Sequence, residues 1–96
     1  AATLLRVVGT DADDDIRFDR GPGGTVQVRI DDLPAGTFAP TGRLAADGLG
    51  GDDHLRVAAN LTLPAWLDGG AGADTLAGGG GRDLLVGGTG ADRLHG

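Results

Sequence analysis

Aspartate residues recur at a fixed spacing in the C-terminal third of this 96-residue chain. From Gly69 onward the sequence divides into three consecutive nonapeptides, which read GGAGADTLA, GGGGRDLLV and GGTGADRLH. Each fits the pattern G-G-x-G-x-D-x-U-x, in which U is a large apolar residue, and every defining position matches in every copy. The pattern places one carboxylate, that of Asp74, Asp83 or Asp92, directly after a glycine-rich turn.

Turns of this kind can stack, and stacked turns can bind a divalent cation. Two nonapeptides make one full coil, so residues 69–74 and 87–92 are predicted to stack on one edge and residues 78–83 to lie on the other. Each turn points backbone carbonyl oxygens inward and adds one carboxylate, so two turns supply about six oxygen ligands, which suits Ca²⁺. Asp74 and Asp92 would repel each other without the cation. The alternative is a glycine-rich solenoid in which Asp only caps the turns.

Two looser copies of the repeat lie upstream. Residues 48–56 read GLGGDDHLR and keep Asp53, and residues 9–17 read GTDADDDIR and keep Asp14. Asp53 precedes Asp74 by 21 residues rather than 18, so a second site between them requires the coil to absorb three extra residues. Asp14 has a carboxylate that could bind a metal, but its turn departs furthest from the motif, and the sequence leaves its role open.

These nonapeptides resemble the RTX, or haemolysin-type calcium-binding, repeats of secreted bacterial proteins. The close resemblance covers Gly69 to Gly96, and a looser one covers residues 9–18 and 48–57. In that family, pairs of stacked turns bind Ca²⁺ within a right-handed parallel β-roll. The resemblance implies one complete site that contains the carboxylates of Asp74 and Asp92 and the carbonyls of Gly69, Ala71, Gly88 and Gly90.

The resemblance implies further calcium ligands at two other turns. Asp53, with Gly48 at the start of its turn, is expected to share an ion with Asp74. Asp83, with Gly78 at the start of its turn, lacks an obvious partner. The preceding turn on its edge falls near residues 60–65, which contain neither glycine nor Asp.

Short strands must hold these turns. Leu76, Leu85 and Leu94 recur every nine residues and are predicted to stack as a single apolar ladder. Upstream, TVQVRI at residues 25–30 alternates as a half-buried strand does, and residues 4–8 and 54–58 are shorter candidates.

Proline and glycine mark the expected breaks between these strands. Residues 19–24 are predicted to be a turn that closes a hairpin, and residues 31–42, which include Pro34 and Pro40, are predicted to be a loop. Residues 60–68 are predicted to form a short strand interrupted by Pro64. Trp66 is expected to plug the solenoid or its junction with the N-terminal part.

Composition excludes several classes of protein. All 14 acidic residues are Asp, all 8 basic residues are Arg, and the net charge is −6. Asp and the 20 glycines favour turns and oppose helix, so the chain should be all-β. Scattered Arg residues in an acidic chain argue against nucleic-acid binding. The lack of Cys excludes thiolate sites, and no apolar run approaches the ~18 residues of a membrane span.

Enzyme motifs are also missing. The chain has no Ser, Cys, Glu or Lys, so the usual hydroxyl and thiol nucleophiles are reduced to Thr. The zinc motif H-E-x-x-H requires Glu, and the phosphate-binding P-loop requires Lys. We therefore expect no enzymatic activity.

The sequence thus predicts an all-β chain with a right-handed parallel β-roll at residues 48–96. Residues 1–47 are expected to be an irregular β-rich segment with one degenerate turn, continuous with the roll, and the chain to be part of a longer protein. The predicted function is calcium-dependent folding and structural support in a larger secreted or cell-surface bacterial protein; the family resemblance implies type I secretion. Two alternatives remain: an adhesive or surface-layer segment that contacts cell-surface or matrix components, and the appended repeat domain of a secreted protease or lipase.

Overall fold

Short strands connected by tight turns make up the chain in the computed structural model, which describes residues 4–38 and 42–95. One 3-10 turn, at Pro22–Gly24, is the helical element of the described ranges. The prediction of an all-β fold is confirmed. The strands are β1 (Leu4–Val8), β2 (Asp15–Arg20), β3 (Val26–Ile30), β4 (Leu33–Phe38), β5 (Arg43–Asp47), β6 (His54–Val57), β7 (Ala65–Asp68), β8 (Thr75–Ala77), β9 (Asp83–Val86) and β10 (Arg93–His95).

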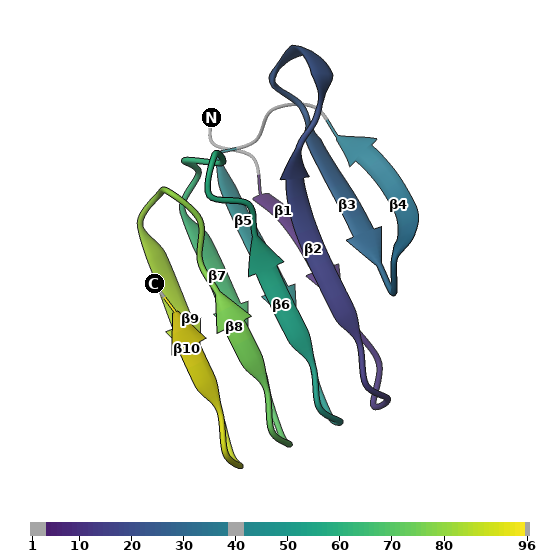
Figure 1. Cartoon of the computed structure of the whole chain (residues 1–96), viewed down its shortest axis with the longest axis vertical. Helices are drawn as coiled ribbons and strands as arrows, with labels where there is room; N and C mark the ends of the chain where they lie inside the picture. The colour runs from purple at the N-terminus through teal and green to yellow at the C-terminus, as the bar shows by residue number, and fades with distance from the viewer. Residues whose placement is uncertain (1–3, 39–41, 96) are drawn as a thin grey trace.

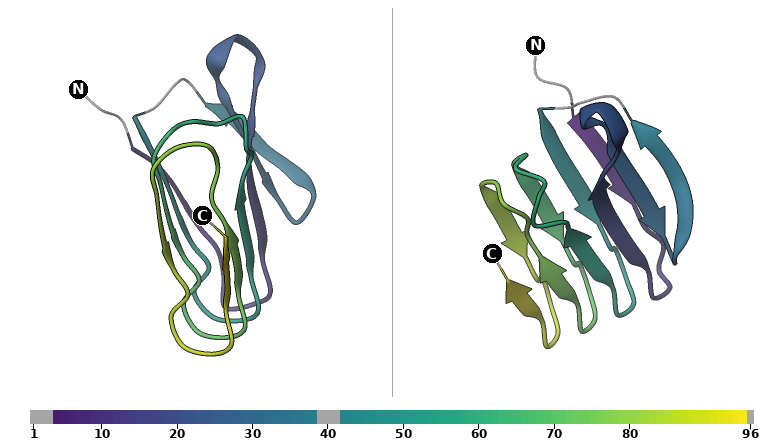
Figure 2. Two further views of the ribbon diagram at one scale, coloured as in Figure 1. Left: turned by 60° about the vertical axis from the view of Figure 1, so that its left-hand side comes forward. Right: turned by 45° about the horizontal axis from the view of Figure 1, so that its top comes forward.

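The strands form two sheets that face each other (Figures 1 and 2). The four-stranded sheet has the order β1-β5-β7-β9, and all its neighbours are parallel. The six-stranded sheet has the order β10-β8-β6-β2-β3-β4. Its pairs are parallel from β10 to β2 and antiparallel from β2 to β4, so this sheet is mixed. The chain passes from one sheet to the other at each turn, apart from the β2–β3–β4 hairpins.

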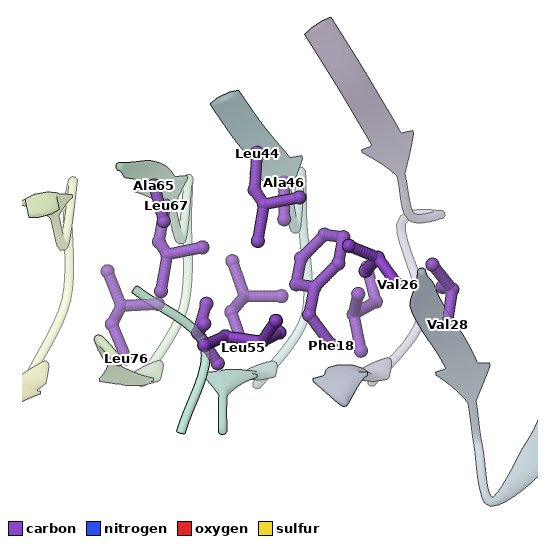
Figure 3. Packing of buried hydrophobic residues seen from close by; sticks show 12 residues of the cluster. Phe18, Val26, Val28, Leu44, Ala46, Leu55, Ala65, Leu67 and Leu76 are labelled. Atoms are coloured by element: carbon purple, nitrogen blue, oxygen red, sulfur yellow. The ribbon is translucent and has the colours of Figure 1, made fainter. Parts of the chain in front are cut away.

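The apolar core lies between the sheets (Figure 3). The expected single leucine ladder is wrong, because Leu76 pairs with Leu94 on the six-stranded sheet while Leu85 pairs with Leu67 on the other. Two nonapeptides make one coil, so alternate repeats contribute to opposite sheets. Leu76 is fully buried, whereas Leu94, in the last strand of its sheet, is 49% exposed.

The predicted strands and hairpin turn are present upstream. Residues 4–8 form β1, Val26–Ile30 form β3 and His54–Val57 form β6. The turn after β2 closes an antiparallel hairpin with β3, as expected.

The prediction of a loop at residues 31–42 is wrong for Leu33–Phe38, which form β4. Asp31 and Asp32 have φ of 53° and 64°, and this left-handed pair makes a tight turn from β3 into β4. Pro34 is tolerated because β4 is an edge strand with a register shift opposite Val28 and Arg29. Residues 39–41, which include Pro40, lie outside the described residues.

The strand predicted at residues 60–68 is shorter than expected. It begins at Ala65, after Pro64, and residues 58–64 form a loop. Trp66 does not plug the solenoid: Ala65 and Leu67 are buried, so the alternation of β7 turns Trp66 outward, where it is 49% exposed. The N-terminal end of the core is covered instead by Phe18, Val26 and Val28 of the first hairpin (Figure 3).

Candidate metal centre

Four six-residue turns stack along one edge of the molecule, at the lower end of the strands in Figure 1. Each leads from a strand of the four-stranded sheet to a strand of the six-stranded sheet; they comprise residues 9–14, 48–53, 69–74 and 87–92. For each pair of neighbouring turns, the strands before the turns and the strands after them are paired with the same offset in residue number. The flanking pairs are Val8 with Asp47 and Asp15 with His54, then Asp47 with Asp68 and His54 with Thr75, then Asp68 with Val86 and Thr75 with Arg93. The turns are therefore stacked residue on residue.

The motif aspartates form a ladder through this stack. The backbone N–H of Asp14 donates to Oδ1 of Asp53 at 2.7 Å, and that of Asp53 donates to Oδ1 of Asp74 at 2.8 Å. The N–H of Asp74 donates to Oδ1 of Asp92 at 2.9 Å. The structure thus brings together Asp74 with Asp92 and Asp53 with Asp74, the two pairs that the sequence suggested, and adds Asp14 at the end of the same row.

Two of these carboxylates, those of Asp53 and Asp74, keep a buried second oxygen without a hydrogen-bond partner. Oδ2 of Asp53 and Oδ2 of Asp74 are buried and accept no hydrogen bond, and these residues are 0% and 1% exposed. Oδ2 of Asp53 lies against Gly48, the first residue of its own turn, and Oδ2 of Asp74 lies against Gly69. A buried, unsatisfied charged oxygen costs several kcal/mol unless it is paired, so a bound cation would stabilise both carboxylates.

Glycine at the second and fourth motif positions lets the turns approach closely. Gly70 and Gly88 have φ of 78° and 79°, and Gly72 and Gly90 have φ of 104° and 97°. A methyl group on Gly70 would collide with the carbonyl oxygen of Leu49 in the preceding turn, and one on Gly88 would collide with that of Gly70. Carbonyl oxygens of one turn therefore lie directly against the glycines of the next turn.

The predicted carbonyl ligands all lie in these turns. Gly69 and Ala71 belong to residues 69–74, and Gly88 and Gly90 belong to residues 87–92, directly beneath. The N–H of Ala71 donates to the carbonyl oxygen of Leu49 at 2.9 Å, which joins this turn to the one above.

The electrostatics of the ladder are unfavourable without a cation. Burial raises the pKa of Asp53 to about 6; the N–H of Asp14 opposes this shift, and the charges of Asp14, Asp74 and Asp13 add to it. Burial also raises the pKa of Asp74, and the charges of Asp92 and Asp52 add to that shift. A divalent ion between the turns would reverse the sign of these interactions.

A second, outer row of carboxylates runs beside the first. Oδ1 of Asp13 accepts from the N–H of Asp52 at 2.7 Å, and Oδ1 of Asp52 accepts from the N–H of Ala73 at 2.9 Å. The nonapeptide pattern, which has no acidic residue at its fifth position, does not predict this row. Its signal was the doubled aspartate, which places Asp at the fifth as well as the sixth motif position in the two upstream turns.

Asp83 lies on the opposite edge, as the coil geometry required. Its turn stacks on the loop at residues 58–64, where the N–H of Gly80 donates to the carbonyl oxygen of Leu61 at 2.8 Å. Arg56 pairs with Ala77, 21 residues on, while Ala65 pairs with Asp83, 18 residues on, so this loop absorbs the three extra residues. Oδ1 of Asp83 has no partner, and burial raises the pKa of this residue. The loop contains no acidic residue, so the structure brings no second carboxylate to Asp83 or Gly78.

The oxygen atoms of these turns suit a hard cation that is bound jointly by carboxylate side chains and backbone carbonyls. Within residues 4–38 and 42–95, no three His or Asp side chains cluster closely enough to hold a metal by themselves. The interval between residues 48–53 and 69–74 and the one between residues 69–74 and 87–92 each have two carboxylates and backbone carbonyl oxygens, the ligand types that Ca²⁺ prefers. The same residues contain no helix long and apolar enough to cross a membrane.

Comparison with known proteins agrees with this chemistry. Residues 66–96 match the family model of the RTX calcium-binding nonapeptide repeat (4 copies). No curated protein and no solved structure matches the chain. The matched region includes the turns at residues 69–74 and 87–92, but not those at 9–14 and 48–53. The C-terminal third of this chain is therefore a segment of RTX calcium-binding nonapeptide repeats.

Proposed function

We propose that this chain is a structural module that binds Ca²⁺ between its stacked turns and folds as it does so, in the form of a right-handed parallel β-roll. The observation that carries the proposal is the pair of buried, unpartnered oxygens, Oδ2 of Asp53 and Oδ2 of Asp74. They occur in two successive intervals of one stack of turns. An ion in each interval would satisfy both atoms.

The ligands of each ion follow from the stacking. Between residues 69–74 and 87–92, Asp74 and Asp92 would bind together with the carbonyls of the predicted set, namely Gly69, Ala71, Gly88 and Gly90. Between residues 48–53 and 69–74, Asp53 and Asp74 would bind with carbonyls of both turns, Gly48 included. We assign no complete site to Asp83 and Gly78, because the loop stacked against their turn has no acidic residue.

Calcium affinity of the extracellular type would make folding conditional on location. Such modules bind with Kd of roughly 0.1–1 mM, so a site with Kd of about 0.1 mM gains roughly 1.4 kcal/mol at about 1 mM Ca²⁺. At cytosolic Ca²⁺ this gain vanishes. The module would therefore order outside the producing cell, as part of a larger secreted or cell-surface bacterial protein that leaves by type I secretion.

The same argument favours a supporting role over catalysis. The titratable groups with a raised pKa at this edge, Asp53 and Asp74, belong to the row of motif aspartates. The chain also lacks the residue types of the common catalytic motifs. We propose that residues 1–47 and 48–96 act as one continuous unit, since buried residues of both ranges share one core cluster. The repeat domain of a secreted protease or lipase is one parent that would suit it.

An adhesive segment is the second candidate function. The outer face of the four-stranded sheet exposes Leu4, Trp66 and Leu84, which are 55%, 49% and 53% exposed. Exposed apolar side chains gathered on one face suit contact with a partner surface. Calcium-dependent association that Trp66→Ala abolishes, measured by sedimentation velocity, would favour this function.

Calorimetric titration with Ca²⁺ and circular dichroism in chelator test the main proposal. Asp74→Asn should abolish both ions, because Asp74 belongs to both intervals, whereas Asp92→Asn should remove one. Asp32→Asn is the matched control, because it removes the same charge from an exposed hairpin turn whose left-handed φ Asn tolerates. Identical spectra in chelator and in millimolar Ca²⁺, or unchanged binding in Asp74→Asn, would contradict the proposal.

A further inference from the structure

The first turn of the stack has a different backbone from the other three. At the second motif position, Leu49, Gly70 and Gly88 all have left-handed φ, between 66° and 79°. At the fourth position, Gly51, Gly72 and Gly90 have φ between 84° and 104°. Thr10 and Ala12 take these positions in the turn at residues 9–14, and neither has a positive φ. The first turn is stacked in register with the others, but its peptide groups are oriented differently.

This backbone surrounds Asp14 with hydrogen-bond donors. The N–H of Thr10 donates to Oδ2 of Asp14 at 2.7 Å, and Oγ1 of Thr10 lies 3.1 Å from Oδ1 and 3.3 Å from Oδ2. The N–H of Ala12 in turn donates to Oγ1 of Thr10 at 3.1 Å. Asp14 thus has close donors for both oxygens, whereas Asp53 and Asp74 each keep one oxygen unpaired.

The interval between the first two turns is consequently already satisfied. On the side of the second turn, Oδ1 of Asp53 accepts the N–H of Asp14. On the side of the first turn, Oδ2 of Asp14 accepts the N–H of Thr10. This atom is equivalent to the unpartnered Oδ2 atoms of Asp53 and Asp74. A cation here would have to displace donors that point at the carboxylate, which raises the cost of binding.

The same end of the molecule is closed in its apolar core. Val26 and Val28 of β3 are 0% and 1% exposed and pack in one cluster with Phe18 of β2. The antiparallel β2–β3–β4 extension thus covers the core on the side where the first turn ends the stack (Figure 1).

We infer that residues 9–14 form a metal-independent cap, in which Thr10 takes the place of a cation beside Asp14 and ends the calcium ladder at Asp53. This inference rests on the proposed function. The ladder then holds ions in the two intervals between residues 48–53, 69–74 and 87–92, and none between residues 9–14 and 48–53. The capped end provides a folded edge on which the repeats order as they bind calcium.

A variant that rebuilds the motif tests the cap. Thr10→Gly combined with Ala12→Gly changes GTDADD to GGDGDD, which restores the repeat glycines. Calorimetry with Ca²⁺ should then show one additional ion per chain, and the urea midpoint in EDTA should fall. Leu49→Gly is the matched control: it changes the same motif position in a turn that already has left-handed φ, so the number of ions should stay constant.

The outcomes separate the cap from the module. Asp14→Asn, in an otherwise unchanged chain, should leave the number of bound ions as it is. Loss of an ion in Asp14→Asn, or no added ion in the folded double variant, would overturn the cap while the calcium module stands. An unsubstituted chain that binds no Ca²⁺ would overturn the module itself.

Discussion

Aspartate has two tasks at the sixth motif position, one for each carboxylate oxygen. Oδ1 of Asp53 and Asp74 accepts an N–H from the turn above, and Oδ2 remains free inside the stack. The short side chain keeps Oδ2 within its own turn, against the first glycine of that turn. Asn could still accept the N–H through its amide oxygen, but it has no negative charge with which to bind a cation. Asp→Asn is therefore the informative substitution.

The stability of the calcium-free chain should fall as pH rises. Burial holds the pKa of Asp53 at about 6, above its ordinary value of 3.8, so folding favours the protonated form. That stabilisation is complete below pH ~4 and is lost as pH rises through about 6; for Asp53 alone it is on the order of 3 kcal/mol. Asp74 acts in the same direction. Urea unfolding in EDTA between pH 4 and 7 measures this decline, and Asp53→Asn should make it shallower.

Saturating Ca²⁺ should reverse this slope, because protons and the cation compete for the same oxygens. In excess calcium the urea midpoint should therefore fall as pH drops below about 6. A midpoint that rises with pH in EDTA over the same range would contradict the assignment of Asp53.

At the scale of the element, the turn depends on glycine for two separable reasons. Gly24 and Gly70 both have φ of 78°, but nothing lies within 4 Å of a methyl group on Gly24, whereas one on Gly70 would collide with Leu49. Gly24→Ala should therefore cost only the left-handed conformation, about 1 kcal/mol.

Gly70→Ala should cost this amount and also force the turns apart, for a total of roughly 3 kcal/mol or more. Calcium affinity should fall with it, because the carbonyl oxygens of adjacent turns separate. Urea unfolding of both variants in EDTA and in Ca²⁺ gives the comparison. Equal losses in the two variants would show that close stacking has no energetic role.

The elements that the sequence predicted well are those fixed by spacing. The nonapeptide period places residues 69–74 and 87–92 on one edge and Asp83 on the other, because the chain must reverse once per repeat. The structure of residues outside the nonapeptide period is harder to predict from the sequence. Pro34 and Gly36 suggested a loop, yet an edge strand needs neither the proline N–H nor a regular register, and β4 forms there.

Local pattern also failed where a residue depends on what lies opposite. Trp66 was expected to plug the solenoid or its junction with the N-terminal part, but the alternation of β7 places it outside. The role of Thr10 was equally invisible, since nothing in GTDADD reveals that its hydroxyl lies beside Asp14. Both depend on contacts across the fold rather than on spacing along the chain.

At the scale of the whole molecule, negative charge is concentrated on one edge. One row of carboxylates runs through all four stacked turns and a second row through the first two, whereas the first hairpin and the two sheets supply the apolar core. The two ends of the paired sheets also differ, because Phe18 and β3 close one end while Leu94 is half exposed at the other. Any cation that binds the edge should stabilise the fold, but by different mechanisms for different ions.

Ionic screening and site binding can be separated by the choice of salt. Sodium chloride at about 0.15 M shortens the Debye length to about 8 Å and weakens repulsion between exposed carboxylates, but buried pairs are screened much less. It cannot supply ligand-to-metal bonds to Oδ2 of Asp53 or Asp74, which are buried. About 1 mM CaCl₂ should therefore raise the free energy of unfolding by roughly 3 kcal/mol over two sites with Kd of about 0.1 mM. NaCl at about 0.15 M should give less than half of that gain.

MgCl₂ at the calcium concentration should also give a smaller gain in the free energy of unfolding, because Mg²⁺ requires a strict octahedron and releases its water reluctantly. Urea unfolding in the three salts measures the difference; if NaCl matched CaCl₂, the ladder would be a screened acidic edge rather than a set of calcium sites.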